Sequence, residues 1–444
     1  METPFLGLVG VGNWGENLAM DFDRVLRAVC DLDKEQLEYY SDIEHIKYTT
    51  TVFEDLLEDP EITAIAIATP AHTHFDLAKR VLLSGRDCYV EKPMTVSSKD
   101  AAVLVRIAKM MGRVLMVGHI IHYTPALQSL DFDELVETVQ NCTDIVAYRY
   151  TKSKQSNINV IWNLGPHDIS FIVRLLGPPH VVVAHLHQEE CIIKLQYPEK
   201  EVKVFLNQGT ANKKQEIVAT GPNGELFTLC NNTIFLNNYF YSSKENTPLE
   251  VECETFINCC KKRQFPYTDG CEGLVVTRVL EMAEKSAAKA GKPVKSFFCH
   301  ESSYIDPGAQ VGFDTKIWHF CHLMPTARVG NNCTIGQNCF IAGTIGHGCK
   351  VQNNVSIYEG VVAGDNVFFG PSCVLTNDKT PRAAHSKNGN YTTTTIEDGV
   401  TIGANATIMC GVTLGEGCMI GAGSVVTKDI PPGVTVIGNP AHVL

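Results

Sequence analysis

The sequence predicts three consecutive folds: an α/β Rossmann domain, an α+β domain with an antiparallel sheet, and an all-β left-handed parallel β-helix. Three observations lead to this prediction. Short apolar runs alternate with helical patterns over residues 1–122. Residues 123–297 contain a series of alternating strands and then closing helices. From residue 301 to 444, an apolar residue recurs at every sixth position.

The composition is typical of a globular protein with a large core. The 444 residues are 44% hydrophobic and 19% charged, which excludes a disordered tail or a coiled coil. A net charge of −12 argues against binding to nucleic acid or to an anionic membrane, because their phosphates would be repelled. No apolar run approaches the roughly 20 residues of a membrane span, and the N-terminus shows no leader pattern. We therefore expect a cytoplasmic protein.

The 17 cysteines include no pair with C-x-x-C spacing. Zinc ribbons and thioredoxin-type sites need that spacing, so we predict no metal site. Thiols of a cytoplasmic chain stay reduced, and we interpret these cysteines as small buried side chains.

Residues 1–122 are expected to form right-handed βαβ units in a doubly wound parallel sheet. The strands are predicted at Phe5–Val9, Val25–Cys30, Ala64–Ala68, Cys88–Val90 and Val114–Val117, with helices at Phe75–Leu83 and Lys99–Met111. In residues 123–297 the strands are predicted at Asp144–Thr151, Val181–His187, Cys191–Gln196, Val202–Leu206 and Gln215–Thr220. Helices are expected there at Leu164–Leu176, Glu250–Lys262 and Gly273–Ala290.

The six-residue repeat in residues 301–444 has an apolar residue at 19 successive positions with two phase breaks. These positions are Ile305, Val311, Ile317, Leu323, Val329, Ile335, Ile341, then Ile345, Val351, Ile357, Ala363, Phe369, Leu375, then Ile396, Ile402, Ile408, Leu414, Ile420 and Val426. Each hexapeptide is expected to form one side of a three-sided coil, with its apolar residue inside. An amphipathic helix would need a period of 3.6 residues.

A glycine-rich turn follows the first predicted strand, where a helix begins. Its residues are Gly10, Gly12, Asn13, Trp14 and Gly15, in the pattern G-x-G-x-x-G that lets a backbone approach a pyrophosphate. Asp31 ends the second strand about 20 residues later. Its carboxylate would accept hydrogen bonds from a ribose diol and repel a 2′-phosphate, which favours NAD over NADP.

Residues 1–297 resemble the Gfo/Idh/MocA oxidoreductase family. The resemblance rests on Gly10–Gly15, Ala68–His74, Glu91-Lys92-Pro93, Val117-Gly-His119 and Asn163–Asp168, which occur in the family's order. It implies that Lys92 and His167 flank the reacting carbon of a sugar and that Asn163 lies at the substrate. It also implies that the cofactor is lined by Thr69, Pro70, His74, Glu91, Lys92 and His119. Asn163 departs from the aspartate or serine that the family often has, and the loop 152–157 lacks its usual sugar-acid pattern.

Oxidation of a secondary alcohol needs a base for the hydroxyl proton while hydride leaves for the nicotinamide. A lysine beside a nicotinamide cation has a lowered pKa, and a histidine titrates near neutrality. Either Lys92 or His167 is therefore suited to be the base, with the other polarising the oxygen.

Residues 305–444 resemble left-handed β-helix acyltransferases, and among these the nucleotide-sugar N-acetyltransferases. The matching segments are Lys316–Phe320, Ile335–Asn338, Val351–Gly360, Gly370–Ser372, Thr376-Asn377, Pro381-Arg382 and Val436–Ala441. The resemblance implies an active trimer that binds acetyl-CoA between neighbouring prisms. It also implies direct attack of an amine on the thioester, and the loop 377–395 is expected to cover the sugar.

Asn377 is the leading candidate for orienting the sugar amine, and Glu359 and Arg382 are candidates for contacts to the sugar or its phosphates. Lys428 is a candidate for a coenzyme A phosphate. His319, His322 and His347 are alternative bases, although each is also compatible with a simple corner residue of the coil.

The two resemblances predict a bifunctional enzyme that oxidises carbon 3 of UDP-N-acetylglucosaminuronate or a similar UDP-sugar and later acetylates the amine placed there. The product would be UDP-2,3-diacetamido-2,3-dideoxyglucuronate, a polysaccharide precursor, and a separate pyridoxal-phosphate aminotransferase would act between the two steps. One alternative is an acetyltransferase whose dehydrogenase-like part only binds nucleotide. Another is a non-enzymatic assembly protein that recruits the aminotransferase.

Overall fold

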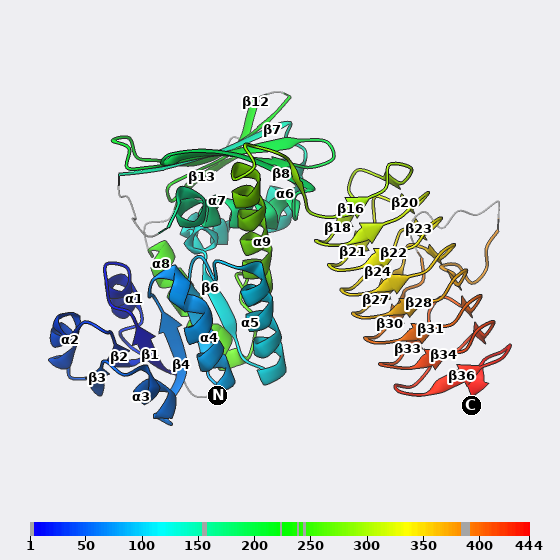
Figure 1. The fold of residues 1–444 in the computed structure, drawn as a ribbon, viewed down its shortest axis with the longest axis horizontal. Coiled ribbons are helices and arrows are strands. Elements are labelled where there is room, and N and C mark those ends of the chain that lie inside the picture. The colour runs from blue at the N-terminus through cyan, green and yellow to red at the C-terminus, as the bar shows by residue number, and fades with distance from the viewer. Residues whose placement is uncertain (1–3, 153–157, 223, 238, 243–245, 383–390) are drawn as a thin grey trace. The chain divides into compact units, whose positions relative to one another are not determined.

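The computed structural model describes residues 4–152, 158–222, 224–237, 239–242, 246–382 and 391–444. The chain divides into two units, one made of Met1–Gln196 and Lys200–Val294 and the other of Tyr197–Glu199 and Lys295–Leu444 (Figure 1). The first unit contains two sheets with their helices, and the second is built almost entirely from short strands.

The first sheet has six parallel strands in the order β3-β2-β1-β4-β5-β6. They are β1 (Phe5–Val9), β2 (Leu26–Cys30), β3 (Tyr48–Thr50), β4 (Ile62–Ile67), β5 (Asp87–Glu91) and β6 (Leu115–Gly118). Five of the six agree with the sequence-based strands to within two residues at each end. The prediction lacked β3, because this edge strand has only three residues, all half-buried, and no apolar run.

Helices cover both faces of this sheet. Those from the first 122 residues are α1 (Gly15–Asp21), α2 (Lys34–Ser41), α3 (Phe53–Glu58), η1 (Ala71–Thr73), α4 (His74–Leu83) and α5 (Ser98–Met111), followed by η2 (Ile120–Tyr123). A later helix, α8 (Pro248–Lys262), also belongs to this core. Its Cys253 and Phe256 are buried in one cluster with Leu18 of α1 and Tyr89 of β5.

The second sheet has nine strands in the order β14-β13-β12-β11-β7-β10-β9-β8-β15. They are β7 (Asp144–Thr151), β8 (Val181–His187), β9 (Glu190–Gln196), β10 (Glu201–Gln208), β11 (Lys214–Gly221), β12 (Gly224–Cys230), β13 (Thr233–Leu236), β14 (Tyr239–Ser242) and β15 (Val294–Lys295). From β14 to β8 its pairs are antiparallel as predicted, except that β7 and β10 run parallel at the centre. The long connection between these two strands, which includes a helix and a hairpin, makes the parallel pairing possible.

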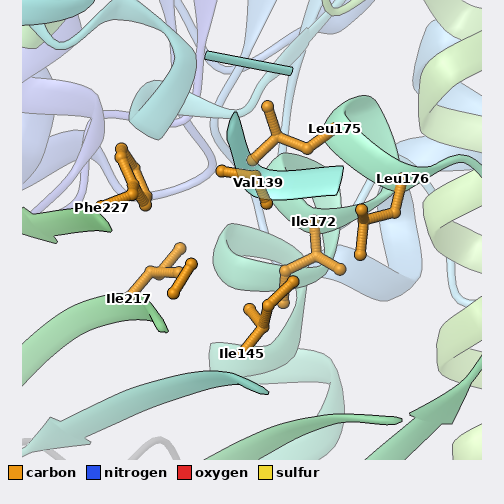
Figure 2. Close-up of a pocket in the computed structure, with 8 residues that line it drawn as sticks. Val139, Ile145, Ile172, Leu175, Leu176, Ile217 and Phe227 are labelled. Carbon is orange, nitrogen blue, oxygen red and sulfur yellow. The ribbon is translucent and has the colours of Figure 1, made fainter. Parts of the chain in front are cut away.

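The helices of this domain are η3 (Pro125–Ser129), α6 (Phe132–Gln140), α7 (Val160–Leu176) and α9 (Gly270–Ala287). α7 begins four residues before the predicted helix, because Asn159 caps it by accepting from the Ile161 and Trp162 amides. Figure 2 shows a cavity of about 10 Å³ between this layer and the sheet, lined by Val139, Ile145, Ile172, Leu175, Leu176, Ile217, Ala219 and Phe227. It is no larger than one water needs, and its lining is entirely apolar.

The second unit is the predicted left-handed parallel β-helix. Its strands stack into three parallel sheets, one for each side of the coil. The first contains β16 (Phe298–Cys299), β19 (Lys316–Ile317), β22 (Thr334–Ile335), β25 (Lys350–Val351), β28 (Phe368–Phe369), β31 (Thr401–Ile402), β34 (Met419–Ile420), β36 (Thr435–Ile437) and the antiparallel β37 (His442–Val443). The second, called the β29 sheet below, contains β17 (Tyr304–Ile305), β20 (His322–Leu323), β23 (Phe340–Ile341), β26 (Ser356–Ile357), β29 (Val374–Leu375), β32 (Thr407–Ile408) and β35 (Val425–Val426). The third contains β18 (Gln310–Val311), β21 (Arg328–Val329), β24 (Thr344–Ile345), β27 (Val361–Ala363), β30 (Thr394–Ile396) and β33 (Thr413–Leu414).

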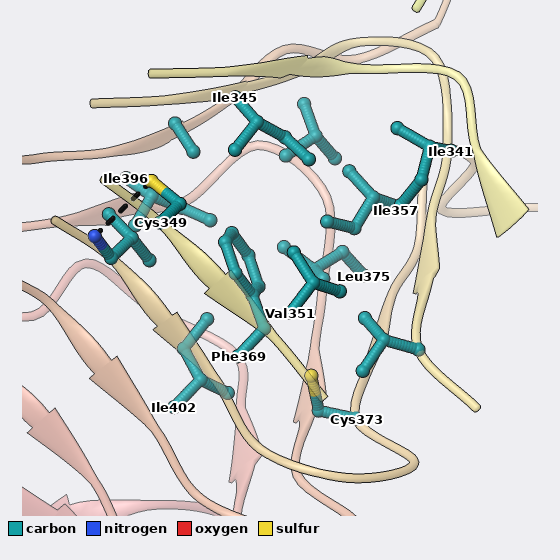
Figure 3. Packing of buried hydrophobic residues seen from close by; sticks show 14 of the residues in the cluster. Ile341, Ile345, Cys349, Val351, Ile357, Phe369, Cys373, Leu375, Ile396 and Ile402 are labelled. Atoms are coloured by element: carbon teal, nitrogen blue, oxygen red, sulfur yellow. Dashed lines mark hydrogen bonds between the residues drawn. The ribbon is translucent and has the colours of Figure 1, made fainter. Parts of the chain in front are cut away.

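All 19 residues of the six-residue repeat lie in these strands, and all but Ile305 are buried. Figure 3 shows their side chains packed inside the prism, with Phe369 between Ile345, Val351 and Ile402. Cys349 and Cys373 belong to the same core. The sulfur atoms of these two cysteines therefore fill space in the core, as the sequence predicts.

Each of the 17 cysteines is a free thiol. No cluster of three histidine, cysteine or acidic side chains in the described residues could hold a metal ion. Among the helices that the structure describes, none is long and apolar enough to cross a membrane.

Candidate functional sites

The glycine-rich turn joins β1 to α1, and each glycine serves a different purpose. Gly10 has a φ of +88°, and a Cβ on Gly15 would lie 2.0 Å from the Gly10 carbonyl oxygen. These two residues are therefore glycines because the turn itself requires them. A Cβ on Gly12, in contrast, would meet no protein atom within 4 Å. Gly12, Asn13 and Trp14 are exposed, so space for a ligand lies directly above the turn.

Asp31 follows β2 and lies against this turn. One carboxylate oxygen accepts from the Val11 amide at 2.8 Å and the other from the Asp33 amide at 2.9 Å. Each oxygen has a second lone pair free, so the carboxylate can accept further hydrogen bonds from a diol. The structure thus places the two predicted parts of a dinucleotide site together.

The segments after β4 and β5 complete this edge of the sheet. The buried ring of His74 contacts the Thr69 and Pro93 carbonyl oxygens at 2.8 Å each, which ties the two segments together. Thr69 is half-buried and its hydroxyl lies 2.6 Å from that of Thr73, whereas Pro70 is exposed. His74 therefore acts on the shape of the site rather than presenting its ring to it.

Lys92 leaves the end of β5 and reaches α7. Its Nζ donates to the backbone oxygen of Asn163 at 3.1 Å, one helical turn before His167. The Asn163 side chain points elsewhere and donates to Gln208 Oε1 at 2.8 Å. The structure thus brings Lys92 close to the turn of α7 that carries His167, and Asn163 contributes its carbonyl.

The surroundings of both candidate bases lower their pKa values. Burial lowers the pKa of Lys92; Glu91 opposes this, and Arg149 adds to it. Burial also lowers the pKa of His167 well below its usual value, and the neighbouring Lys92, Arg149 and His119 lower it further. His167 Nδ1 is buried without a hydrogen-bond partner in the described residues, so it is available to a ligand.

Arg149 is a site residue that the sequence analysis missed. Its guanidinium on β7 makes two hydrogen bonds of 2.8 Å to the fully buried carboxylate of Asp168. This pair fixes the helical turn that carries His167 and places a permanent positive charge beside it. No local pattern around Arg149 indicates this pairing, which only the packing of β7 against α7 creates.

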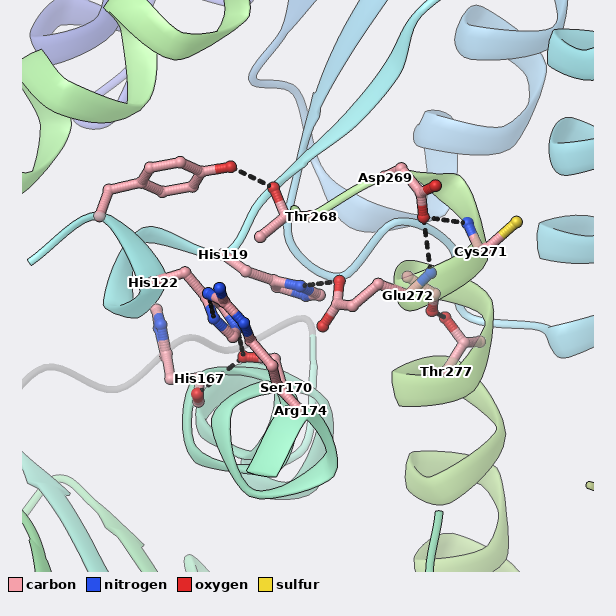
Figure 4. A network of polar contacts seen from close by, with 12 residues as sticks. His119, His122, His167, Ser170, Arg174, Thr268, Asp269, Cys271, Glu272 and Thr277 are labelled. Atoms are coloured by element: carbon pink, nitrogen blue, oxygen red, sulfur yellow. Dashed lines mark hydrogen bonds and ion pairs between the residues drawn. The ribbon is translucent and has the colours of Figure 1, made fainter. Parts of the chain in front are cut away.

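Figure 4 shows a second layer of polar contacts behind His167. His119 Nδ1 lies 2.7 Å from Glu272 Oε2, and the buried His119 Nε2 has no partner in the described part of the chain. His122 contacts Ser170 and Arg174 at 3.2 Å each, and Ser170 donates to the His167 carbonyl. The His122 contacts hold α7 against η2, and the His119 contact reaches Glu272 of α9.

In the β-helix, three of the predicted residues line up on one corner of the β29 sheet. Ile357, Leu375, Ile408 and Val426 are in-register partners on successive coils. Two residues after each stand Glu359, Asn377, Cys410 and Lys428. With a strand spacing of about 4.8 Å, Glu359 is one coil from Asn377 and Lys428 two coils away on the other side. We call Glu359, Asn377 and Lys428 the corner column.

The remaining β-helix candidates lie apart from this column or make structural contacts. His322 is three strands from β29 in the sheet order, and its Nε2 pairs with Asp306 at 3.1 Å. His347 Nδ1 accepts from the Asn331 amide at 2.9 Å, as a corner residue does. The His319 ring lies 3.7 Å from that of His300.

Arg382 is exposed, and its guanidinium donates to the Pro381 carbonyl at 3.3 Å. Residues 383–390, the middle of the loop expected to cover the sugar, lie outside the described residues. The same is true of residues 153–157, in the loop expected to meet the substrate of the first unit.

Comparisons with known proteins agree with this division. Residues 6–119 match the Gfo/Idh/MocA model, an oxidoreductase family with an NAD-binding Rossmann fold. Residues 302–343 and 393–428 match the bacterial transferase hexapeptide model of six repeats.

Two curated relatives are each similar to about a third of the chain or somewhat more. The dTDP-3-amino-3,6-dideoxy-alpha-D-galactopyranose 3-N-acetyltransferase of Aneurinibacillus thermoaerophilus is 41% identical over 149 residues, which are 32% of this chain and 78% of that protein. The bifunctional protein GlmU of Rubrobacter xylanophilus is 27% identical over 216 residues, 39% of this chain. The chain spans 45% of the length of that GlmU protein, which is about half.

Solved structures match the first unit. UDP-N-acetylglucosamine 3-dehydrogenase GnnA from Acidithiobacillus ferrooxidans superposes with a TM-score of 0.57 at 20% identity, covering 65% of this chain and 99% of that one. At this identity the match shows the fold.

Fold, sites and comparisons together define an NAD-binding oxidoreductase domain followed by a hexapeptide-repeat transferase domain. Residues 6–119 match the Gfo/Idh/MocA Rossmann domain, and the second part of the chain belongs to the hexapeptide-repeat acetyltransferases.

Proposed function

We propose that the chain is a bifunctional nucleotide-sugar enzyme. Its first unit oxidises the 3-hydroxyl of UDP-N-acetylglucosaminuronate, or of a similar UDP-sugar, with NAD. Its second unit transfers an acetyl group from acetyl-CoA to the amine of the corresponding 3-amino sugar. The position of Lys92 beside His167, at the edge where the glycine-rich turn leaves space, carries the first half of the proposal.

The residues present fit NAD. The open space over Gly12 suits a pyrophosphate, and Asp31 retains lone pairs for a ribose diol. Bound there, NAD supplies the acceptor for the hydride. Thr69, Pro70, Glu91 and His119 are proposed to line it.

Lys92 and His167 are proposed to handle the proton of the sugar hydroxyl. Both are half-buried and have a lowered pKa, which suits either one to take part in the proton transfer. Arg149 and Asp168 hold the turn of α7 in place, and Arg149 makes a second positive charge beside His167 unfavourable. This arrangement favours proton transfer to one of the two groups at a time.

The corner column is the proposed site of acetyl transfer. Asn377 has a half-buried side chain and is suited to orient an amine, and Glu359 on the next coil is suited to bind sugar hydroxyls. Lys428 is exposed and is proposed to meet a coenzyme A phosphate. Six cysteines of the repeat belong to the core of the prism, and the amine is proposed to attack the thioester directly; these are Cys321, Cys333, Cys339, Cys349, Cys373 and Cys418.

Each face of a single prism is a flat sheet, so we propose that a homotrimer builds the cleft for acetyl-CoA. Two similar proteins support the choice of carbon 3. The similar acetyltransferase acts on a 3-amino sugar nucleotide, and the dehydrogenase with the similar fold acts at position 3. The two reactions join only if another protein, proposed to be a pyridoxal-phosphate aminotransferase, converts the ketone to an amine.

The test uses the intact chain and two substrates. Reduction of NAD with UDP-N-acetylglucosaminuronate and acetylation of the 3-amino sugar nucleotide should both be detected. Acetylation without NAD reduction would indicate that the chain is an acetyltransferase whose dehydrogenase-like domain only binds nucleotide. The absence of both, in folded protein that also binds no coenzyme A by calorimetry, would favour an assembly protein.

A further inference from the structure

A chain of buried and partly buried hydrogen bonds connects the glycine-rich turn to α8 through β5. Trp14 Nε1 donates to Glu91 Oε1 at 2.6 Å, and Tyr89 Oη lies 3.0 Å from the same oxygen. Tyr89 Oη also lies 3.2 Å from Glu252 Oε2, across 163 positions of the sequence. The Lys92 amide donates to the other Glu91 oxygen at 3.1 Å.

The number of protons restricts how this chain can be charged. The Tyr89 hydroxyl has one hydrogen but contacts two carboxyl groups. If both carboxylates were ionised, one contact would place two lone pairs against each other. One of the two acids must therefore carry a proton and donate it to the Tyr89 oxygen.

The surroundings identify Glu252 as the neutral acid. Burial raises the pKa of Glu91, but the charge of Lys92 and the hydrogen bonds from Trp14, Tyr89 and the Lys92 amide oppose this shift and stabilise the anion. Glu252 is completely buried, and its Oε1 has no partner in the residues that the structure describes. Burial raises the pKa of Glu252 well above its usual value, and the Glu91 charge raises it further.

No cation among the described neighbours offsets a charge on Glu252. Tyr89 and Glu91 lie near it on β5, and Tyr123 lies near it on η2. Cys253 is its neighbour on α8, and Asp21 of α1 raises the pKa of Cys253. All these groups are neutral or negative. An ionised Glu252 would be a buried charge without a counter-ion.

The backbone of β6 leaves room for this arrangement. Gly118 pairs with Glu91 across the sheet, and a Cβ there would lie 2.7 Å from both Glu91 Oε1 and Tyr89 Oη. Any larger residue would separate the two oxygens. The space at Gly118 is a second, independent sign that the contact between Tyr89 and Glu91 is part of the fold.

We propose that Glu252 is a positioning residue of the oxidation site. As a neutral acid, it donates a hydrogen bond to the Tyr89 oxygen, so that the Tyr89 hydroxyl donates to Glu91. Glu91 then remains an anion, which accepts from Trp14 and balances the charge of Lys92. The inference rests on the proposed oxidation. It connects the proton state of a residue on α8 with both the cofactor turn and the candidate base.

The first experiment measures the proton directly, without any substrate. Infrared difference spectra between the wild type and Glu252→Gln at pH 7 should show the loss of one carbonyl band of a protonated carboxylic acid, and this band should shift in heavy water. Glu254→Gln, an exposed carboxylate on the same helix, is the matched control and should remove no such band. Loss of only a carboxylate band in Glu252→Gln would overturn the proposal.

The second experiment follows the relay to its two ends. Tyr89→Phe removes a donor from Glu91, which favours its protonated form and leaves Lys92 without its anion. In a background where Trp162 and Trp318 are Phe, Trp14 emission should change in Tyr89→Phe. The limb of the pH profile of kcat/KM that is assigned to Lys92 should move to lower pH by about one unit, because Lys92 has lost its neighbouring anion. Unchanged emission and an unchanged pH profile would contradict the relay.

Rescue by the conservative variant separates positioning from packing. Glu252→Leu removes the donor and should lower kcat/KM for oxidation about ten-fold, the factor that one hydrogen bond carries. Glu252→Gln keeps a neutral donor and should recover most of that loss. Equal losses in both would contradict the proposal. If the wild type reduces no NAD, the proposed function fails, while the infrared band and Trp14 emission still decide on the relay.

Discussion

Lys92 Nζ and the backbone oxygen of Asn163 are joined by a hydrogen bond of 3.1 Å across 71 positions of the sequence. This bond connects the end of β5 to the turn of α7 that carries His167. The Lys92 ammonium group therefore links the Rossmann sheet to the helix layer of the second sheet. In the proposed reaction, this contact decides whether a base and a polarising group share one sugar oxygen.

The glycine-rich turn offers a test that separates folding from binding. Gly15→Ala should destabilise the first unit by several kcal/mol, because its Cβ would fall 2.0 Å from the Gly10 oxygen. Gly12→Ala should leave the melting temperature unchanged but weaken NAD binding at least ten-fold, because its methyl group enters open space above the turn. Thermal unfolding and calorimetric titration measure the two effects. Normal NAD affinity in Gly12→Ala would place the cofactor elsewhere.

Asp31 is expected to set the choice of cofactor. Its carboxylate lies at the turn, held by the Val11 and Asp33 amides, where a 2′-phosphate would be repelled. Asp31→Ser should reduce the preference for NAD over NADP about ten-fold or more, measured as the ratio of the two dissociation constants. Glu16→Ser, an exposed acid in the first turn of α1, is the control. An unaltered ratio in Asp31→Ser would remove Asp31 from the site.

The β-helix core predicts a large loss of stability from one substitution. Phe369 is completely buried among the inward-pointing residues of the prism. Phe369→Ala should lower the free energy of unfolding of the second unit by about 3–5 kcal/mol, through lost burial and the cavity left behind. Val362→Ala, at an outward position that is 45% exposed, should cost far less. Calorimetric transitions of the two variants check this difference.

Acid stability should depend on His122. Arg174 donates to its Nδ1, and burial, Arg174 and His119 lower its pKa well below 6.5. The unfolded chain takes up a proton below about pH 6.5 while the folded chain does not, so stability falls as the pH drops. The free energy of unfolding of His122→Asn should fall less steeply as the pH drops, by up to ~1.4 kcal/mol for each pH unit. Urea unfolding between pH 7 and 5 measures this slope. The exposed His72→Asn should leave the slope as it is, and an equal slope in both variants would contradict this account.

Local patterns predicted the parts of the fold that depend on neighbouring residues. The six-residue repeat identified 19 strand positions of the prism, 18 of them buried, and the glycine turn identified the start of α1, because both follow from contacts within one turn or coil. The parallel pairing of β7 with β10 and the short edge strand β3 were missed. Their formation depends on the sheet around them rather than on their own residues.

The sites were predictable only to the level of motifs. Lys92 and His167 stand in recognisable motifs, but the partners that set their charge do not. Arg149 meets Asp168 across 19 positions and Tyr89 meets Glu252 across 163, and neither pair leaves a signal in the local sequence. Asn163 stands in a motif, yet it contributes a carbonyl oxygen, which no side-chain pattern predicts.

The most direct test of the account uses two variants of the intact chain and both assays. Lys92→Ala should lower NAD reduction with the UDP-sugar by about 10²–10⁴-fold and leave acetyl transfer unchanged, because it removes a proton-transfer group in the first unit only. Asn377→Ala should show the reverse pattern. A wild-type chain that reduces no NAD, or a Lys92→Ala variant that retains full NAD reduction, would contradict the proposal that one chain carries both steps.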